Sequence, residues 1–302
     1  MKSWFKYLVY ASLIFLLFAL KEGDYLTIPT IHSSLYLTLS FIVLFLSFMS
    51  GAICWQHILL KNAIHVQLRE CLASVGLSVF SKYLPGKIWS IMGRAAYIGE
   101  KKSFPLHQIS SISLDAQLLA LWLGLVFGAF GLFLVDGIRI WGWLILLLWI
   151  GLTAIIFWSL PRSSVEFLLK KLFKKNVVLP QLSPQAIFSL LPWFMVYWIL
   201  WTMSFYLLVM SLTSIDVPLS VGLGFPLAGT LGIMAFVVPG GLGVREGVLV
   251  AFLSLAGISV PLATTISIAA RLWYLIGEVA IFVVGWMADR GSAWSSDRKV
   301  SM

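Results

Sequence analysis

The chain has 302 residues, of which 60% are hydrophobic and 11% are charged, and its mean hydropathy is +0.98. Because soluble domains carry about 25% charged residues, this composition excludes a sizeable soluble domain and indicates an integral membrane protein. The net charge of +9 would suggest nucleic-acid binding in a soluble protein. Here basic cytoplasmic loops and contact with anionic lipid explain it, so no nucleic-acid partner is expected.

Six stretches are apolar and long enough to cross a bilayer as helices, which takes about 20 residues. No small-residue cleavage site follows the first of them, so we interpret it as a span and not as a signal peptide. In chain order the predicted spans are Trp4–Leu20, Leu35–Ile58, Ser111–Val135, Ile140–Leu160, Ala186–Leu212 and Ala263–Met287.

Two further apolar stretches do not fit a simple span. Cys71–Leu84 is too short and ends at Pro85-Gly86, and Val217–Ala256 is long enough for two passes but breaks at Pro239-Gly240-Gly241. Basic residues flank the first stretch on both sides, so a full crossing would place one basic cluster outside. We therefore expect two re-entrant broken-helix hairpins, the first entering from the cytoplasm and the second from the outer face.

Lysine and arginine orient the chain, since short loops that carry them stay in the cytoplasm. With the N-terminus inside, six spans leave only Lys21 and Arg139 on the outer side. We therefore expect a multi-pass protein of the cytoplasmic (inner) membrane with both termini in the cytoplasm.

The order of spans and hairpins divides the chain into two similar halves. Each half has three spans, with one hairpin between the second and the third, and the halves start on opposite faces of the membrane. This hydropathy pattern favours an inverted-topology repeat, although residue identity between the halves is too weak to establish it. The predicted fold is an all-α polytopic membrane protein with six full spans and two re-entrant hairpins. It forms a single domain over 1–290, with halves 1–136 and 137–290 and a loose cytoplasmic tail at 291–302.

The break in the second hairpin predicts an anion site. A half-helix that begins near Gly243 would present unpaired N–H groups and the positive end of its dipole to an anion such as phosphate. Arg245 would add a fixed charge, and Glu246 would pair with an arginine or help to conduct a proton or cation. The predicted site residues of this hairpin are Pro239, Gly240, Gly241, Gly243, Arg245 and Glu246.

The first hairpin and the last span supply further charges. Lys87 follows the Pro85-Gly86 break, and Arg94 lies about two turns further on. Arg271 and Glu278 are seven residues apart, so they share one helix face. Facing the interior, they would complete a charge cluster with the second hairpin. We expect these residues to contact a substrate or coupling ion; a structural ion-pair network that holds the hairpin is the alternative.

No metal site, cofactor or enzymatic activity is expected. The four histidines are scattered without the paired spacing of metal ligands. A membrane transferase would need an aspartate pair, a His–Glu motif or a phosphate loop, and none has the required spacing here.

The motifs at the two breaks are similar to those of a known family. Pro239-Gly240-Gly241-Leu242-Gly243-Val244-Arg245-Glu246-Gly247 resembles the most diagnostic element of the flippase-like transmembrane region of lysylphosphatidylglycerol synthases, the multiple peptide resistance factor proteins. Tyr83-Leu84-Pro85-Gly86-Lys87-Ile88-Trp89, with Gly93-Arg94 downstream, resembles its first motif, and Arg271 in "ARLWYLIGE" matches a frequent arginine of its last helix. The resemblance covers nearly the whole chain.

The resemblance implies a polytopic flippase-like fold with two re-entrant hairpins and a lipid or lipid-linked substrate. It does not imply aminoacyl transfer, which belongs to a large soluble C-terminal domain in the bifunctional proteins. Only Asp289–Met302 follows the last predicted span here.

These observations predict a non-enzymatic translocator of an anionic lipid or of a polyprenyl-phosphate-type lipid, whose headgroup binds between the two hairpin tips. The alternatives are a non-transporting accessory subunit of an envelope lipid or glycan pathway and a membrane-embedded transferase acting on a lipid phosphate. The substrate, the direction of transport, the coupling ion and the oligomeric state are left open by the sequence.

Overall fold

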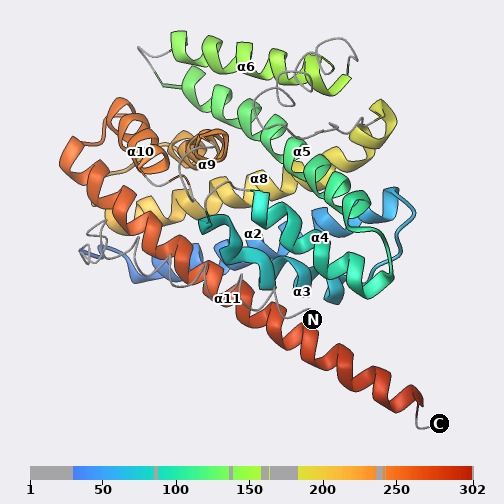
Figure 1. Cartoon of the computed structure of the whole chain (residues 1–302). Coiled ribbons are helices and arrows are strands. Elements are labelled where there is room, and N and C mark those ends of the chain that lie inside the picture. The colour runs from blue at the N-terminus through green and yellow to red at the C-terminus, as the bar shows by residue number, and fades with distance from the viewer. Residues whose placement is uncertain are drawn as a thin grey trace.

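The computed structural model describes residues 30–84, 88–135, 139–157, 163, 183–235, 241 and 243–300, with the backbone alone at 88, 139 and 291–300. Within these ranges the regular elements are helices (Figure 1), which confirms the predicted all-α fold class. In chain order they are α2 (Ser34–Lys61), α3 (Leu68–Ser78), the 3-10 helix η1 (Val79–Tyr83), α4 (Ile88–Lys102), α5 (Leu106–Phe133), α6 (Arg139–Phe157), α8 (Pro184–Leu212), the 3-10 helix η2 (Leu219–Leu223), α9 (Gly224–Met234), α10 (Val244–Leu255) and α11 (Val260–Val300).

Five of these helices are long and apolar enough to cross a membrane, so the chain is a multi-pass membrane protein. Their membrane-length segments are Ser34–Lys61, Leu106–Phe133, Ile140–Phe157, Pro184–Leu212 and Val260–Arg290. They correspond to five of the six predicted spans, and the remaining one, Trp4–Leu20, lies outside the described residues. The last helix passes its predicted end at Met287, and the segment predicted as a loose tail has a helical backbone up to Val300.

Both stretches predicted as hairpins consist of short helices. The first comprises α3 and η1 followed by α4, and the second comprises η2 and α9 followed by α10. The two limbs of each pair pack against each other. The connecting residues 85–87, 236–240 and 242 lie outside the described residues, and entry of each pair from one membrane face stays a prediction.

Helices of each half of the chain pack against helices of the other half. The middle spans α2 and α8 pack along each other and run antiparallel, because the amides of His32 and Ser33 at the start of α2 donate to Ser211 O near the end of α8 (2.8 and 3.2 Å). Helix α3 of the first pair packs on α11 of the second half, and α9 of the second pair packs on α5 of the first half. Such reciprocal contacts are expected of an inverted repeat and favour that prediction.

A close crossing brings the first pair of short helices onto α11. A Cβ atom added at Gly76 of α3 would overlap Ile281 O and lie 2.9 Å from the Cα of Gly285, and one added at Gly285 would lie 2.8 Å from Gly76 Cα. Small residues let membrane helices approach backbone to backbone in this way. Because η1 follows α3 directly, the crossing also carries η1 against α11.

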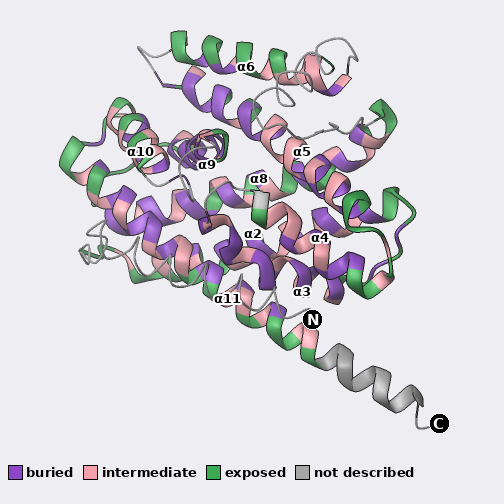
Figure 2. Cartoon of the chain, viewed as in Figure 1, coloured by how far each residue is buried: buried purple, intermediate pink, exposed green. Residues whose placement is uncertain are grey.

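Burial is concentrated where α2, α3, α5, α8 and α11 meet, whereas α6 is largely exposed (Figure 2). Helix α6 packs on α5, and its outward side carries exposed apolar residues such as Trp141, Trp143 and Leu147. Apolar side chains that face outward are expected of a helix surrounded by lipid. The polar and charged side chains described below lie inside this apolar shell.

Candidate functional site

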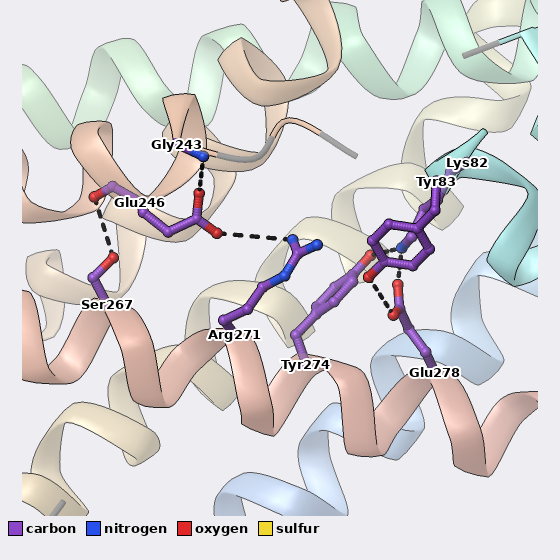
Figure 3. Close-up of polar contacts among 8 residues, drawn as sticks. All are labelled: Lys82, Tyr83, Gly243, Glu246, Ser267, Arg271, Tyr274 and Glu278. Atoms are coloured by element: carbon purple, nitrogen blue, oxygen red, sulfur yellow. Dashed lines mark hydrogen bonds and ion pairs between the residues drawn. The ribbon is translucent and has the colours of Figure 1, made fainter. Parts of the chain in front are cut away.

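One face of α11 carries the polar residues of the candidate site. Ser267, Arg271, Tyr274 and Glu278 follow one another at intervals of four, three and four residues, which places them along one side of a helix. Figure 3 shows these side chains pointing away from α11 toward the two broken segments. Arg271 and Glu278 are both buried, with 3% and 0% of their surface exposed, so the shared face predicted for them is directed into the protein.

The start of α10 meets this face at Arg271. Gly243 has a φ of +79°, a backbone conformation that favours glycine, and its N–H donates to Glu246 Oε2 (2.7 Å). Glu246 Oε1 lies 3.8 Å from Arg271 Nη1, and Ser267 Oγ donates to the main-chain oxygen of Glu246 (3.1 Å). The predicted pairing of Glu246 with an arginine is thus observed. The helix start that we expected to be open is capped by the chain's own carboxylate.

The end of η1 meets the same face about two turns further along. Tyr83 Oη donates to Glu278 Oε2 (2.7 Å), and Lys82 Nζ forms an ion pair with Glu278 Oε1. Lys82 Nζ also donates to Tyr274 Oη (2.9 Å), and the Arg271 guanidinium lies 5.2 Å from the centre of the Tyr83 ring (Figure 3). The segments that flank the two breaks therefore converge on α11.

Arg245 is buried but has no acidic partner among the described residues. Its guanidinium lies 4.4 Å from the ring centre of Phe225 and 4.1 Å from that of Tyr274, an arrangement in which the ring faces attract the cation. The Nη2 atoms of Arg245 and Arg271 are both buried, and neither has a hydrogen-bond partner in the part of the chain that the structure describes. Buried donors of this kind are rare, and they suit a site that binds an acceptor from outside the chain.

Arg94 approaches the interior from α4. Its Nε atom donates to Ser113 Oγ of α5 (2.5 Å), and its guanidinium lies 4.9 Å from the ring centre of Trp55. Ser113 Oγ in turn donates to Ile91 O (2.9 Å). Neutral groups thus hold Arg94 in place and leave its charge without a carboxylate in these contacts.

A cavity of about 480 Å³ lies beside these contacts, and Tyr274 of α11 is among the residues that line it. Its lining comes from both halves of the chain and includes aromatic side chains of α2 and α8 such as Phe48, Trp55 and Trp201. No carboxylate is found among the described lining residues. The cations that line it are Lys82, Arg94, Arg245 and Arg271.

The predicted glycines have different surroundings. Gly241 has a φ of +69°, and a Cβ atom added there would lie 2.9 Å from Gly232 O, so only glycine fits this approach of α9 and the start of α10. Gly243 is exposed. Lys87, Pro239 and Gly240 lie outside the described residues.

Four residues of the site were not predicted as site residues: Lys82, Tyr83, Ser267 and Tyr274. Lys82 and Tyr83 come shortly before the predicted break at Pro85-Gly86, and a polar pair at the edge of a predicted helix break could have identified them. Ser267 and Tyr274 could have been found by extending the Arg271–Glu278 face in both directions. Among the described residues, no group of three or more histidine, cysteine or acidic side chains could hold a metal ion.

A family model described as the lysylphosphatidylglycerol synthase transmembrane region matches residues 3–281. The match covers both broken segments, the helices around the cavity and most of α11. No curated protein and no solved structure matches the chain.

Proposed function

The chain belongs to the family of the lysylphosphatidylglycerol synthase transmembrane region, and from this membership and the central cavity we propose that it flips an anionic lipid, or a lipid-linked phosphate of the polyprenyl type, across the cytoplasmic membrane. The observation that carries the proposal is the gathering of four cations, from η1, α4, α10 and α11, around one cavity. Intramembrane cations are costly, and their concentration at one place marks a substrate pathway.

The headgroup would bind where the two broken segments meet α11. Arg245 and Arg271 have buried N–H groups without partners among the described residues, and a phosphate oxygen would accept from both in charge-assisted hydrogen bonds. The Glu246 carboxylate accepts a hydrogen bond from the Gly243 N–H and lies beside Arg271. An incoming phosphate would therefore compete with this carboxylate. Such an exchange keeps the arginine neutralised both before and after the lipid binds.

Transport would proceed by alternating access, with one half rocking against the other around the headgroup. The antiparallel contact of α2 and α8 joins the middle spans of the two halves and is the natural hinge surface for this motion. In this proposal both termini lie in the cytoplasm, the basic loops face the anionic inner leaflet, and no covalent step is catalysed.

The test is a flipping assay with purified protein in phosphatidylcholine vesicles that contain a trace of labelled phosphatidylglycerol or labelled polyprenyl phosphate. Arg245→Ala and Arg271→Ala each remove a buried donor that faces the cavity, so the rate of flipping should fall at least about tenfold, the equivalent of about 1.4 kcal/mol. Far-UV circular dichroism and size-exclusion profiles should match those of the wild type.

The matched control is Arg290→Ala, which removes an exposed arginine at the end of the last span, where its guanidinium stacks on Trp286 at 3.8 Å. This variant should flip lipid at the wild-type rate. Wild-type flipping rates in both cavity variants would show that Arg245 and Arg271 are not needed for transport. A wild-type protein that moves neither probe, but co-purifies with an envelope enzyme, would replace transport with an accessory role.

A further inference from the structure

The charges around the central cavity do not balance. Lys82 is paired with Glu278, and Arg271 lies within 3.8 Å of Glu246. Arg94 and Arg245 contact hydroxyl, carbonyl and aromatic groups instead. Among the described residues, two of the four lining cations pair with carboxylates, which leaves an excess of two positive charges, carried by Arg94 and Arg245.

The other buried acids of the described chain do not change this balance, because neither pairs with a cation that lines the cavity. Glu70 pairs with Lys102 at the start of α3 (2.9 Å), and Asp115 of α5 forms no ion pair with Lys82, Arg94, Arg245 or Arg271 among the described residues. An uncompensated charge in a dry interior costs several kcal/mol. A ligand that brings two negative charges would offset the excess, whereas a ligand that brings one would leave a buried arginine unpaired.

We propose that the cavity selects its lipid by charge and prefers a phosphomonoester headgroup, with about two negative charges, over a phosphodiester headgroup with one. This inference rests on the proposed function and gives its substrate class. A phosphomonoester loses its second proton near pH 6, so it carries nearly two charges at pH 8. Its three terminal oxygens can also accept from several guanidinium groups at once, which a diester cannot match.

The size of the cavity fits a headgroup and not a whole lipid. About 480 Å³ lies in the lower half of the range for sites that enclose a small molecule. The phosphate would therefore enter the cavity while the hydrocarbon chains stay among the helices or in the bilayer. Phosphatidic acid and a polyprenyl monophosphate share this headgroup chemistry and differ only in their chains.

The decisive measurement is a competition between phosphatidic acid and phosphatidylmethanol with identical acyl chains. The two lipids differ by one methyl group on the phosphate, so their charge changes while their size hardly does. Both are added in equal amounts to the purified full chain in a zwitterionic detergent at pH 8, and native mass spectrometry measures which one is retained. We expect at least about tenfold more phosphatidic acid, since a second unit charge near an unpaired arginine contributes more than 1.4 kcal/mol.

Other results would contradict the inference in distinguishable ways. Retention of the two lipids in a ratio near one overturns charge selection and leaves anionic lipid transport standing. Retention of neither in preference to phosphatidylcholine overturns the proposed function as well. A further competition between phosphatidic acid and a polyprenyl monophosphate of equal charge identifies which lipid supplies the headgroup.

A charge-matched pair of variants tests which residue sets the preference. Arg245→Gln removes one of the two excess charges, so the retained ratio should fall toward one. Arg290→Gln makes the same substitution outside the cavity and should keep the wild-type ratio. An unchanged ratio in Arg245→Gln would overturn the charge count around the cavity.

Discussion

Glu278 is a fully buried carboxylate whose neighbours come from a different part of the chain. Tyr83 Oη donates to Oε2, and Lys82 forms an ion pair with Oε1. Because a buried charge is tolerated only when it is paired and hydrogen-bonded, these contacts tie η1 to α11. Glu278 is therefore a structural anchor for the first broken segment as well as part of the charge balance of the cavity.

Tyr83→Phe tests this anchor. The substitution keeps the ring but removes the hydrogen bond to the carboxylate, so the free energy of unfolding should fall by about 1.5–3 kcal/mol, the usual value for a hydrogen bond to a charged group. Chemical unfolding in detergent micelles measures the change. Tyr206→Phe is the control, because its hydroxyl lies 3.5 Å from Val217 O and should contribute only a few tenths of a kcal/mol. Equal effects of the two substitutions would contradict the role of Tyr83.

At the scale of elements, the crossing of α3 and α11 positions η1 and therefore Lys82 and Tyr83. Gly76→Ala places a methyl group against the backbone of α11 at Ile281 and Gly285. The helices must separate, which should lower the free energy of unfolding by about 1–3 kcal/mol and reduce flipping as η1 shifts. Unfolding and flipping assays on the same preparation measure both effects.

Gly151→Ala is the matched control for this crossing. A Cβ atom at Gly151 on α6 has no neighbour within 4 Å, and alanine favours a helix over glycine by about 0.5–1 kcal/mol. This variant should be as stable as the wild type or slightly more stable, with unchanged flipping. A Gly76→Ala protein that behaves like Gly151→Ala would show that α3 and α11 tolerate a wider separation.

The ion pair between α3 and α4 predicts a dependence of stability on pH. Burial alone would raise the pKa of the Glu70 carboxyl, but Lys102 Nζ at 2.9 Å, the Gln67 N–H and the charge of Lys101 hold this pKa below its usual value. A lowered pKa in the folded state means that the stabilisation is present above the unfolded pKa and is lost as the pH falls through the folded pKa.

Glu70→Gln should therefore lower the thermal unfolding midpoint at pH 7, where the pair contributes about 1 kcal/mol. Below the folded pKa of Glu70 the wild type loses the same contribution, so the two midpoints should converge. Unfolding scans of both proteins between pH 7 and pH 3 measure the difference. A difference that persists unchanged at the lowest pH would assign the effect to packing and not to the ion pair.

At the scale of the whole molecule, the antiparallel pair α2 and α8 fixes which loops lie at opposite ends. The start of α2 bonds to the end of α8, so the exposed residues Lys61, at the end of α2, and Ser214, after α8, lie at opposite ends of this pair. The charge pattern predicts that the Lys61 end lies in the cytoplasm. The packing of α2 on α8 shows that the two loops lie at opposite ends, and the charge pattern predicts which end faces the cytoplasm.

Single cysteines introduced as Lys61→Cys and Ser214→Cys, with Cys54 and Cys71 replaced by serine, test this orientation. A membrane-impermeant maleimide should label Ser214→Cys in intact spheroplasts and should label Lys61→Cys only after permeabilisation, because only the outer face is accessible beforehand. Gel-shift detection measures the labelled fraction. The reverse pattern would invert the topology and, with it, the leaflet from which each broken segment enters.

The sequence alone determined the membrane class, five helices of the described chain, the two interrupted segments and the acidic or basic character of the candidate site. These properties are local, because apolar length, helix-breaking residues and the shared face of Arg271 and Glu278 can be read within a few turns. The N-terminal span and the residues of both tight turns stay predictions.

Only the tertiary structure decided which charges meet. Tyr83 and Glu278 are 195 positions apart, and no periodicity connects them; their contact follows from the glycine crossing of α3 and α11. The same crossing brings Lys82 to Glu278, and the packing of α4 on α5 sets Arg94 against Ser113. The cap that Glu246 forms on Gly243 spans only three residues and is local. Hydropathy records which residues avoid water, but the pairing of buried charges depends on how helices distant in the chain pack together.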